Sequence, residues 1–266
     1  AVHAYADAHR HLERAIDLEP AVPGGGDEVR QRVALRRRAA DAADLGGDVS
    51  RAMELTRSAL ALVDPSLDPV TAGLLHARIG YLQWSMGDSS TALAAHREAV
   101  RLIPSDPPTR ERARVLASLG GALMGAGRWA ESRAVCEAAI ACAVTAAAHA
   151  EESRARNMLG SDLVALGEID AGIVELRTAC RIAEQTGPDD VLIGGYYNLA
   201  LNLVTADRSE EALEEAETGR ATARAAATTT WGFAPPGPRR RRGAGPLTLG
   251  NTGDSILYYR HPGSLG

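Results

Sequence analysis

The sequence contains no lysine, so all 29 of its basic residues are arginine. A phosphate-binding loop of the GxxxxGK(S/T) type needs a lysine, which excludes that kind of nucleotide site. Aromatic residues make up only 4% of the chain, and Phe233 is the single phenylalanine. The core must therefore be built from small aliphatic side chains, which suits closely packed helices.

Cysteine is also scarce, since Cys136, Cys142 and Cys180 are the only three. An odd number without paired spacing excludes a disulfide framework. There is no apolar run of about 18 residues or more and no visible signal peptide, so we expect a cytoplasmic protein without a membrane contact. A net charge of −5 and a pI of about 5.8 disfavour contact with nucleic acid by this segment.

No group of residues has the spacing of a catalytic or metal site. His9 and His11 lie two residues apart, so on a helix they point to different faces. The run Gly24–Gly26 is followed by two acidic residues, which would repel a phosphate and favour a linker. The three cysteines have no histidine at a matching place, so buried thiols are the better interpretation. We therefore expect no enzyme activity, no metal and no cofactor.

What the sequence does contain is an internal repeat of 40 residues. A pair of residues, most often Leu-Gly, recurs at this interval. The pairs are Ala39-Ala40, Ile79-Gly80, Leu119-Gly120, Leu159-Gly160 and Leu199-Ala200. A fixed period in this range is typical of a solenoid, in which each unit buries its apolar face against the next.

Each repeat predicts a helix, a tight turn and a second helix. If the glycine of the Leu-Gly pair is position 8, the first helix covers about positions 2 to 14, with apolar residues at helical spacing such as Leu116, Leu119 and Leu123. A glycine such as Gly127 then ends the helix, and small residues at positions 20 and 27 let the two helices cross closely. The predicted fold is an all-α solenoid of about five and a half repeats.

The repeats cover only part of the chain, which divides it into two regions. Residues 1–227 are predicted to form the helical repeat domain, and residues 228–266 an irregular, Gly-, Pro- and Arg-rich tail that includes Arg239–Arg242. Ala8, Leu12 and Ala15 resemble the second half of a repeat. The domain is therefore expected to begin within a repeat, as a fragment of a longer protein.

These repeats resemble the tetratricopeptide repeat (TPR), which has Leu-Gly at positions 7 and 8, small residues at 20 and 27 and Pro at 32. Matching residues include Trp129, Ala92, Ala99, Ala139 and Pro104. Two features depart from the pattern: position 11 is never tyrosine, and the period of 40 exceeds the 34 residues of a TPR. A HEAT-like solenoid, which has about this period, is the alternative.

The segments 154–168 and 189–203 resemble the TPR region of large actinobacterial LuxR-family regulators. In that family an ATPase precedes the TPR array and a helix-turn-helix follows it. The all-arginine, Ala-rich composition is also typical of very G+C-rich bacterial DNA. The resemblance implies a non-enzymatic sensor and interaction module of a transcriptional regulator. The alternative is a stand-alone TPR scaffold that assembles other proteins.

In a TPR array, positions 2, 5, 9, 12 and 13 of the first helix tend to line the concave groove. Carried onto this sequence, with Asn198 as a neighbour, they give a predicted binding surface for a protein, a peptide or a small-molecule effector. Its residues are Arg37, Asp41, Tyr81, Trp84, Arg114, Asn157, Tyr197 and Asn198. Tyr, Trp and Arg are enriched at binding hot spots. The alternative for Tyr81, Trp84 and Tyr197 is packing between repeats. The resemblance also allows self-association.

Overall fold

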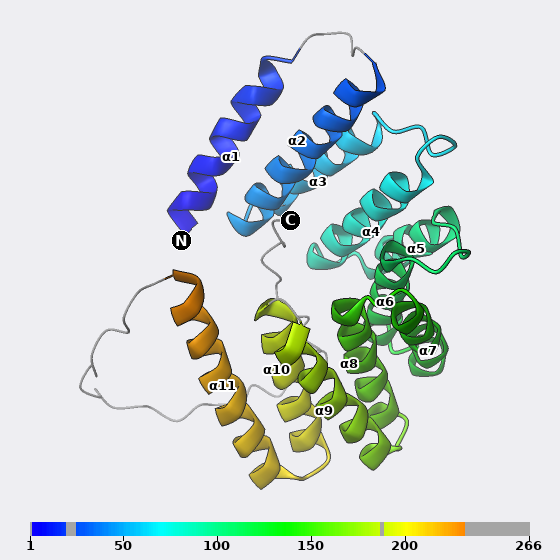
Figure 1. The fold of residues 1–266 in the computed structure, drawn as a ribbon, viewed down its shortest axis with the longest axis vertical. Helices are drawn as coiled ribbons and strands as arrows, with labels where there is room; N and C mark the ends of the chain where they lie inside the picture. Colours follow the sequence, from blue (N-terminus) through cyan, green and yellow to red (C-terminus); the bar gives the residue numbers. More distant parts are fainter. Residues whose placement is uncertain (1, 20–24, 187–188, 232–266) are drawn as a thin grey trace, which may run out of the picture.

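The computed structural model describes residues 2–19, 25–186 and 189–231. These residues form eleven α-helices and no strand (Figure 1). The helices are α1 (Val2–Asp17), α2 (Gly26–Leu45), α3 (Val49–Leu60), α4 (Pro69–Ser85), α5 (Ser89–Leu102), α6 (Arg110–Gly125), α7 (Trp129–Thr145), α8 (His149–Ala165), α9 (Ile169–Thr186), α10 (Asp189–Thr205) and α11 (Ser209–Trp231). The all-helical fold expected from the sequence is confirmed for this part of the chain.

Local sequence signals explain where several helices begin. At the start of α3, α4, α5 and α6, a side chain accepts a hydrogen bond from the backbone N–H three residues later. The capping residues are Asp48, Asp68, Asp88 and Thr109. Such a cap satisfies one of the backbone donors that have no partner within the helix, which stabilises the helix by about 1 kcal/mol.

The turn inside each helix pair contains a residue in the left-handed region, with φ between 59° and 92°. These residues are Gly47, Gly87, Gly127, Gly167 and Asp207, at successive steps of 40 residues. Glycine adopts this conformation without steric cost, and Asp is among the residues that tolerate it best. The turn predicted at Gly127 is therefore confirmed, and the same turn recurs in the other helix pairs.

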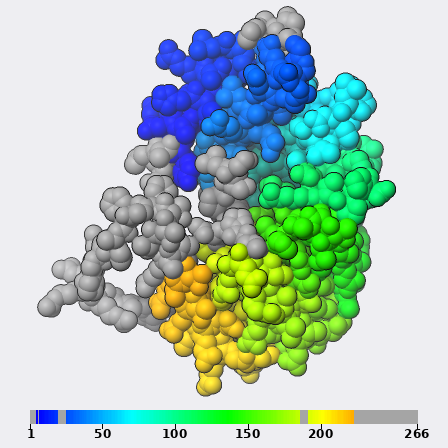
Figure 2. Space-filling model, viewed as in Figure 1, coloured from blue at the N-terminus to red at the C-terminus, as the bar shows by residue number. Residues whose placement is uncertain are grey.

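The helices stack in sequence order along an open arc, with α1 at one end and α11 at the other (Figure 1). In space-filling form the colours likewise run in order from blue to orange (Figure 2). Among the described residues, α4 contacts α6, α6 contacts α8 and α8 contacts α10, whereas α3, α5, α7 and α9 contact only their neighbours in sequence. Helices approach one another most closely on the inner side of a curve, so α4, α6, α8 and α10 form the inner layer. Helix α2 joins this layer through the ion pairs of Asp41 and Asp44 with Arg78 on α4.

The glycines at position 8 lie where the two helices of a pair approach most closely. A Cβ atom added at Gly80, Gly120 or Gly160 would come within 2.5–2.7 Å of a side chain on the following helix. The pairs are Gly80 with His96, Gly120 with Cys136 and Gly160 with Leu176. These close contacts explain how a core of Ala and Leu can pack without large aromatic residues.

The last helix extends further than the sequence analysis expected. Helix α11 continues to Trp231, beyond the predicted end of the repeat domain at residue 227. The segment 228–231 contains no proline, and the first proline after it is Pro235, so nothing in this stretch breaks the helix. The rest of the predicted tail, with Arg239–Arg242, lies outside the described residues, and the division into two regions stays a prediction.

Candidate partner-binding face

Ion pairs on the inner layer connect neighbouring helix pairs. The guanidinium Nη2 of Arg78 on α4 lies 3.1 Å from Oδ1 of Asp41 and 3.1 Å from Oδ2 of Asp44, both on α2. Asp44 is buried, and Asp41 is half-buried. Burial raises the pKa of Asp41, although Arg78 and, to a lesser degree, Arg37 favour its ionised form.

The next inner helix places a second arginine cluster beside the first. Arg114 on α6 has an exposed side chain, although neighbouring protein atoms partly desolvate its charge. This poor hydration lowers the pKa of Arg114, and Arg154, Arg37 and Arg110 lower it further by like-charge repulsion, with Glu151 opposing them. Residues from α2, α6 and α8 therefore act electrostatically on one another across the inner layer.

We call this set the arginine strip: Arg37, Arg78, Arg110, Arg114 and Arg154. The carboxylates that lie against these arginines already form ion pairs with members of the strip. Glu151 on α8 is 3% exposed, and its Oε1 lies 2.9 Å from Nε of Arg110. Asp41 and Asp44 lie against Arg78, as described above. Within the described residues, neither Arg37 nor Arg114 has an ion pair, and both are exposed.

Toward the C-terminal end, amide side chains replace arginine on the inner layer. Asn198 on α10 donates a hydrogen bond from Nδ2 to Oδ1 of Asn157 on α8, at 2.8 Å. One turn further along, Asn202 donates to Oγ of Ser161 at 3.1 Å. Tyr197, beside Asn198, is 37% exposed. The structure thus brings together the predicted residues Asn157 and Asn198, but only Asn198 is half-buried, whereas Asn157 is 6% exposed and lies beneath the surface.

The two predicted aromatic anchors on α4, Tyr81 and Trp84, are only half-buried. The Cζ atom of Arg78 lies 5.0 Å from the ring centroid of Tyr81, which is within range of a cation–π contact. The same tyrosine also packs against the core formed by α2, α3 and α4. Tyr81 therefore contacts both the arginine strip and the interior, so packing accounts for part of its role.

Sequence reasoning missed three members of the strip: Arg78, Arg110 and Arg154. Arg110 is the first residue of α6, outside the repeat positions assigned to the groove. Arg154 lies 40 residues after Arg114, at the same repeat position, so the period itself could have identified it. Arg78 lies at position 6, outside the positions assigned to the groove. Arg78 belongs to the strip because it forms ion pairs with Asp41 and Asp44 on α2. No local sequence pattern indicates those two ion pairs.

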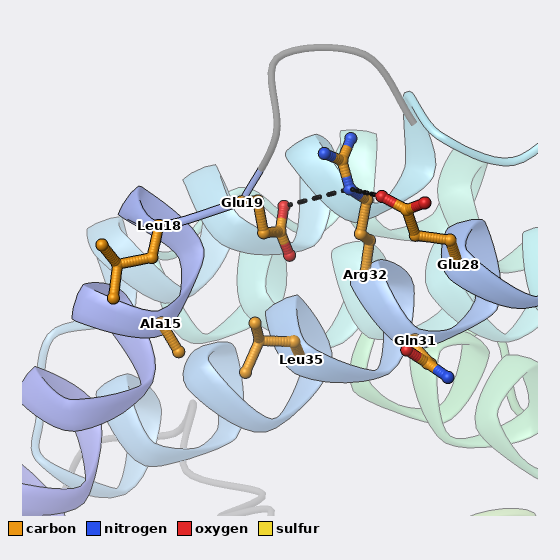
Figure 3. A pocket seen from close by; sticks show the side chains of 7 residues that line it. All are labelled: Ala15, Leu18, Glu19, Glu28, Gln31, Arg32 and Leu35. Atoms are coloured by element: carbon orange, nitrogen blue, oxygen red, sulfur yellow. Dashed lines mark ion pairs between the residues drawn. The ribbon is translucent and has the colours of Figure 1, made fainter. Parts of the chain in front are cut away.

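A separate hollow lies between α1 and α2 (Figure 3). It is lined by Ala15, Leu18, Glu19, Glu28, Gln31, Arg32 and Leu35. Figure 3 shows the guanidinium of Arg32 between two carboxylates, with Nε 3.6 Å from Glu19 Oε2 and 3.6 Å from Glu28 Oε1. Because its cation and anions face one another, this hollow is a weaker candidate for a charged ligand than the inner layer.

Other kinds of site have no support among the described residues. The described residues contain no cluster of three or more His, Cys, Asp or Glu side chains that could hold a metal ion. Burial raises the pKa of the Cys136 and Cys180 thiols to about 12, which makes them poor nucleophiles near neutral pH. None of the described helices combines the length and the apolar character needed to cross a bilayer.

No protein-family model and no curated protein matches the sequence. Solved structures do match. BtubC (BKLC) from P. vanneervenii has a TM-score of 0.58 at 16% identity, over 92% of this chain and 96% of that one. A putative kinesin light chain from Podosopora anserina, with nearly identical TPR-like repeats, has a TM-score of 0.51 at 18% identity, over 76% of this chain and 96% of that one.

A third solved structure extends this comparison. A Rap protein complexed with competence and sporulation factor has a TM-score of 0.61 at 12% identity, over 83% of this chain. The match spans 66% of the Rap protein. Identities this low establish the fold alone, and that fold is a TPR-like α-solenoid.

Proposed function

We propose that the inner layer binds a protein or peptide partner and that the chain is a non-enzymatic interaction module. The observation that carries this proposal is the row of exposed and half-buried Arg, Asn and Tyr side chains on the inner helices, from Arg37 to Tyr197. Such side chains combine hydrogen-bonding groups with flat apolar surface, which is the usual composition of a recognition surface.

The TPR-like fold and the solved neighbours support this proposal. One of those neighbours, the Rap protein, is in complex with competence and sporulation factor. A concave layer suits an elongated partner because successive repeats offer it contacts along its length. The inert thiols and the lack of a metal cluster in the described ranges favour binding over catalysis.

Two biological settings fit such a module. The resemblance to actinobacterial LuxR-family regulators favours the sensor region of a transcriptional regulator, with self-association as a further role. The alternative is a stand-alone scaffold. The gene sequence on both sides separates them: an ATPase phosphate loop upstream and a helix-turn-helix downstream support the regulator, and an isolated repeat array supports the scaffold.

Binding by the inner layer can be tested with a random-peptide display library selected on the 266-residue chain. A selected peptide is then titrated against wild type and against Tyr197→Ala, whose side chain is exposed enough to be removed without opening the core. We expect about 10- to 30-fold weaker binding if Tyr197 anchors the peptide. The control is Arg97→Ala on the outer helix α5, which has an exposed side chain.

Both variants must first keep the helicity and thermal midpoint of the wild type. Loss of affinity on Tyr197→Ala, together with unchanged affinity on Arg97→Ala, supports binding by the inner layer. If every selected peptide binds the two variants as tightly as wild type, the proposed function is wrong.

A further inference from the structure

We infer that the arginine strip recognises an acidic segment of the partner, in which Asp or Glu carboxylates pair with Arg37 and Arg114. This inference rests on the proposed function, because it names the chemistry of the partner that the inner layer would bind. It assigns the acidic segment to the part of the layer formed by α2, α4 and α6.

The ion pairs of the arginine strip show which of its charges are already balanced. Asp41 and Asp44 both lie 3.1 Å from Arg78, and Glu151 lies 2.9 Å from Arg110. The carboxylates of the strip are therefore already engaged. Arg37 and Arg114 are exposed and have no ion pair within the described part of the chain, so their guanidinium groups are open to carboxylates from outside.

The arginines of the strip also repel one another. Arg37, Arg110 and Arg154 each act unfavourably on the charge of Arg114. The charge of Arg114 is partly desolvated, so water screens this repulsion less than it would between fully hydrated side chains. An incoming carboxylate would offset it, and a guanidinium can hold a carboxylate through two parallel hydrogen bonds.

The carboxylates of the strip favour an acidic peptide over a nucleic acid. A nucleic acid carries a continuous row of phosphates, which would have to pass Asp41 and the other strip carboxylates. Separate carboxylates on a peptide can instead be placed against Arg37 and Arg114 and avoid the acidic side chains between them.

The test uses two fluorescein-labelled peptides of about 12 residues, one of alternating Glu and Gly and the other with every Glu replaced by Gln. Their dissociation constants are measured by fluorescence anisotropy with the full 266-residue chain, at about 50 mM and about 300 mM NaCl. We expect the Glu peptide to bind about tenfold more tightly than the Gln peptide at low salt. We expect this difference to shrink at high salt because mobile ions screen exposed pairs.

A matched pair of double variants locates the binding. Arg37→Gln/Arg114→Gln removes the two open charges of the inner layer, on α2 and α6. Arg57→Gln/Arg97→Gln removes two exposed arginines from α3 and α5. Both variants lower the net charge by the same amount, so general electrostatic attraction changes equally. We expect about tenfold weaker binding of the Glu peptide for the first variant and less than about twofold for the second.

Three results would overturn the inference: equal affinity for the Glu and Gln peptides, equal losses in the two double variants, or tighter binding of a single-stranded DNA of equal length than of the Glu peptide. Its failure can be told apart from failure of the proposed function. Library-selected peptides that depend on Tyr197 but not on Arg37 and Arg114 would keep the partner-binding layer and reject only the acidic partner.

Discussion

The close contact between Gly120 on α6 and Cys136 on α7 can be tested by a double-mutant cycle. A Cβ atom at Gly120 would lie 2.5 Å from Sγ of the fully buried Cys136, and its next nearest neighbours, in Ser132, lie 3.8–3.9 Å away. The sulfur is thus the one atom that obstructs the methyl group of Gly120→Ala. Removing that sulfur should turn a harmful substitution into a favourable one.

The magnitudes follow from two opposing effects. Alanine inside a helix is about 1 kcal/mol more favourable than glycine, and overpacking costs about 1–3 kcal/mol. Gly120→Ala alone should therefore lower the free energy of unfolding by about 1 kcal/mol. In a Cys136→Ala background the clash is gone, so the same change should raise it by up to about 1 kcal/mol. The expected coupling is about 2 kcal/mol.

The assay is urea denaturation followed by circular dichroism, with a reducing agent to keep the thiols free. Gly160 provides the matched control, because its added Cβ would meet the carbonyl oxygen of Gly172 at 2.7 Å and the backbone nitrogen of Leu176 at 3.0 Å. Truncating Leu176 leaves those backbone atoms in place, so Leu176→Ala should not rescue Gly160→Ala. A coupling free energy below about 0.5 kcal/mol between Gly120 and Cys136 would show that the Cys136 sulfur is not what obstructs the added methyl group.

Two further predictions concern single positions. Asp162 is fully buried, and burial raises its pKa from 3.8 to about 7, with the nearby Ser132 hydroxyl opposing the shift. The contribution of Asp162 to the free energy of unfolding should be greatest below about pH 4, where the carboxyl is protonated in both states. It should fall by roughly 4 kcal/mol as the pH rises to about 7. Unfolding of Asp162→Asn and wild type from about pH 4 to 8 should thus show a growing advantage for the variant, and a constant difference would contradict a raised pKa. Ala147 has φ 51°, so Ala147→Gly should raise the free energy of unfolding by up to about 1 kcal/mol and raise the thermal midpoint with it. Gly127→Ala should lower both quantities, because Gly127 also has a positive φ. Midpoints that move the other way would show that φ is not the cause.

Comparison with wild type is essential for the Asp162 prediction. The buried His96 acts in the opposite direction, because burial lowers its pKa from 6.5 to about 4. It favours the folded state above pH 6.5, and that contribution is lost as the pH falls toward 4. The difference between Asp162→Asn and wild type cancels the contribution of His96 and isolates that of Asp162.

The helices and their turns follow from local features of the sequence. Three such features can be recognised from a few neighbouring residues. They are the left-handed turn at Gly127, the side-chain cap at Asp88 and the absence of a side chain at Gly120. These features act through local backbone geometry, and the 40-residue spacing repeats them along the chain. The helix-turn-helix units and the close contact at position 8 could therefore be predicted without coordinates.

Which charged side chains meet depends on how the helix pairs pack on one another. Arg37 and Arg114 are 77 residues apart in the sequence, yet both act on Asp41. The pairing of Arg78 with Asp44, and the complete burial of Asp162, likewise depend on how one helix pair packs on the next. The curve of a solenoid is the sum of small rotations between neighbouring repeats, set by side-chain packing at each interface. No local signal encodes that sum, so the arginine strip could be recognised only after the repeats were stacked.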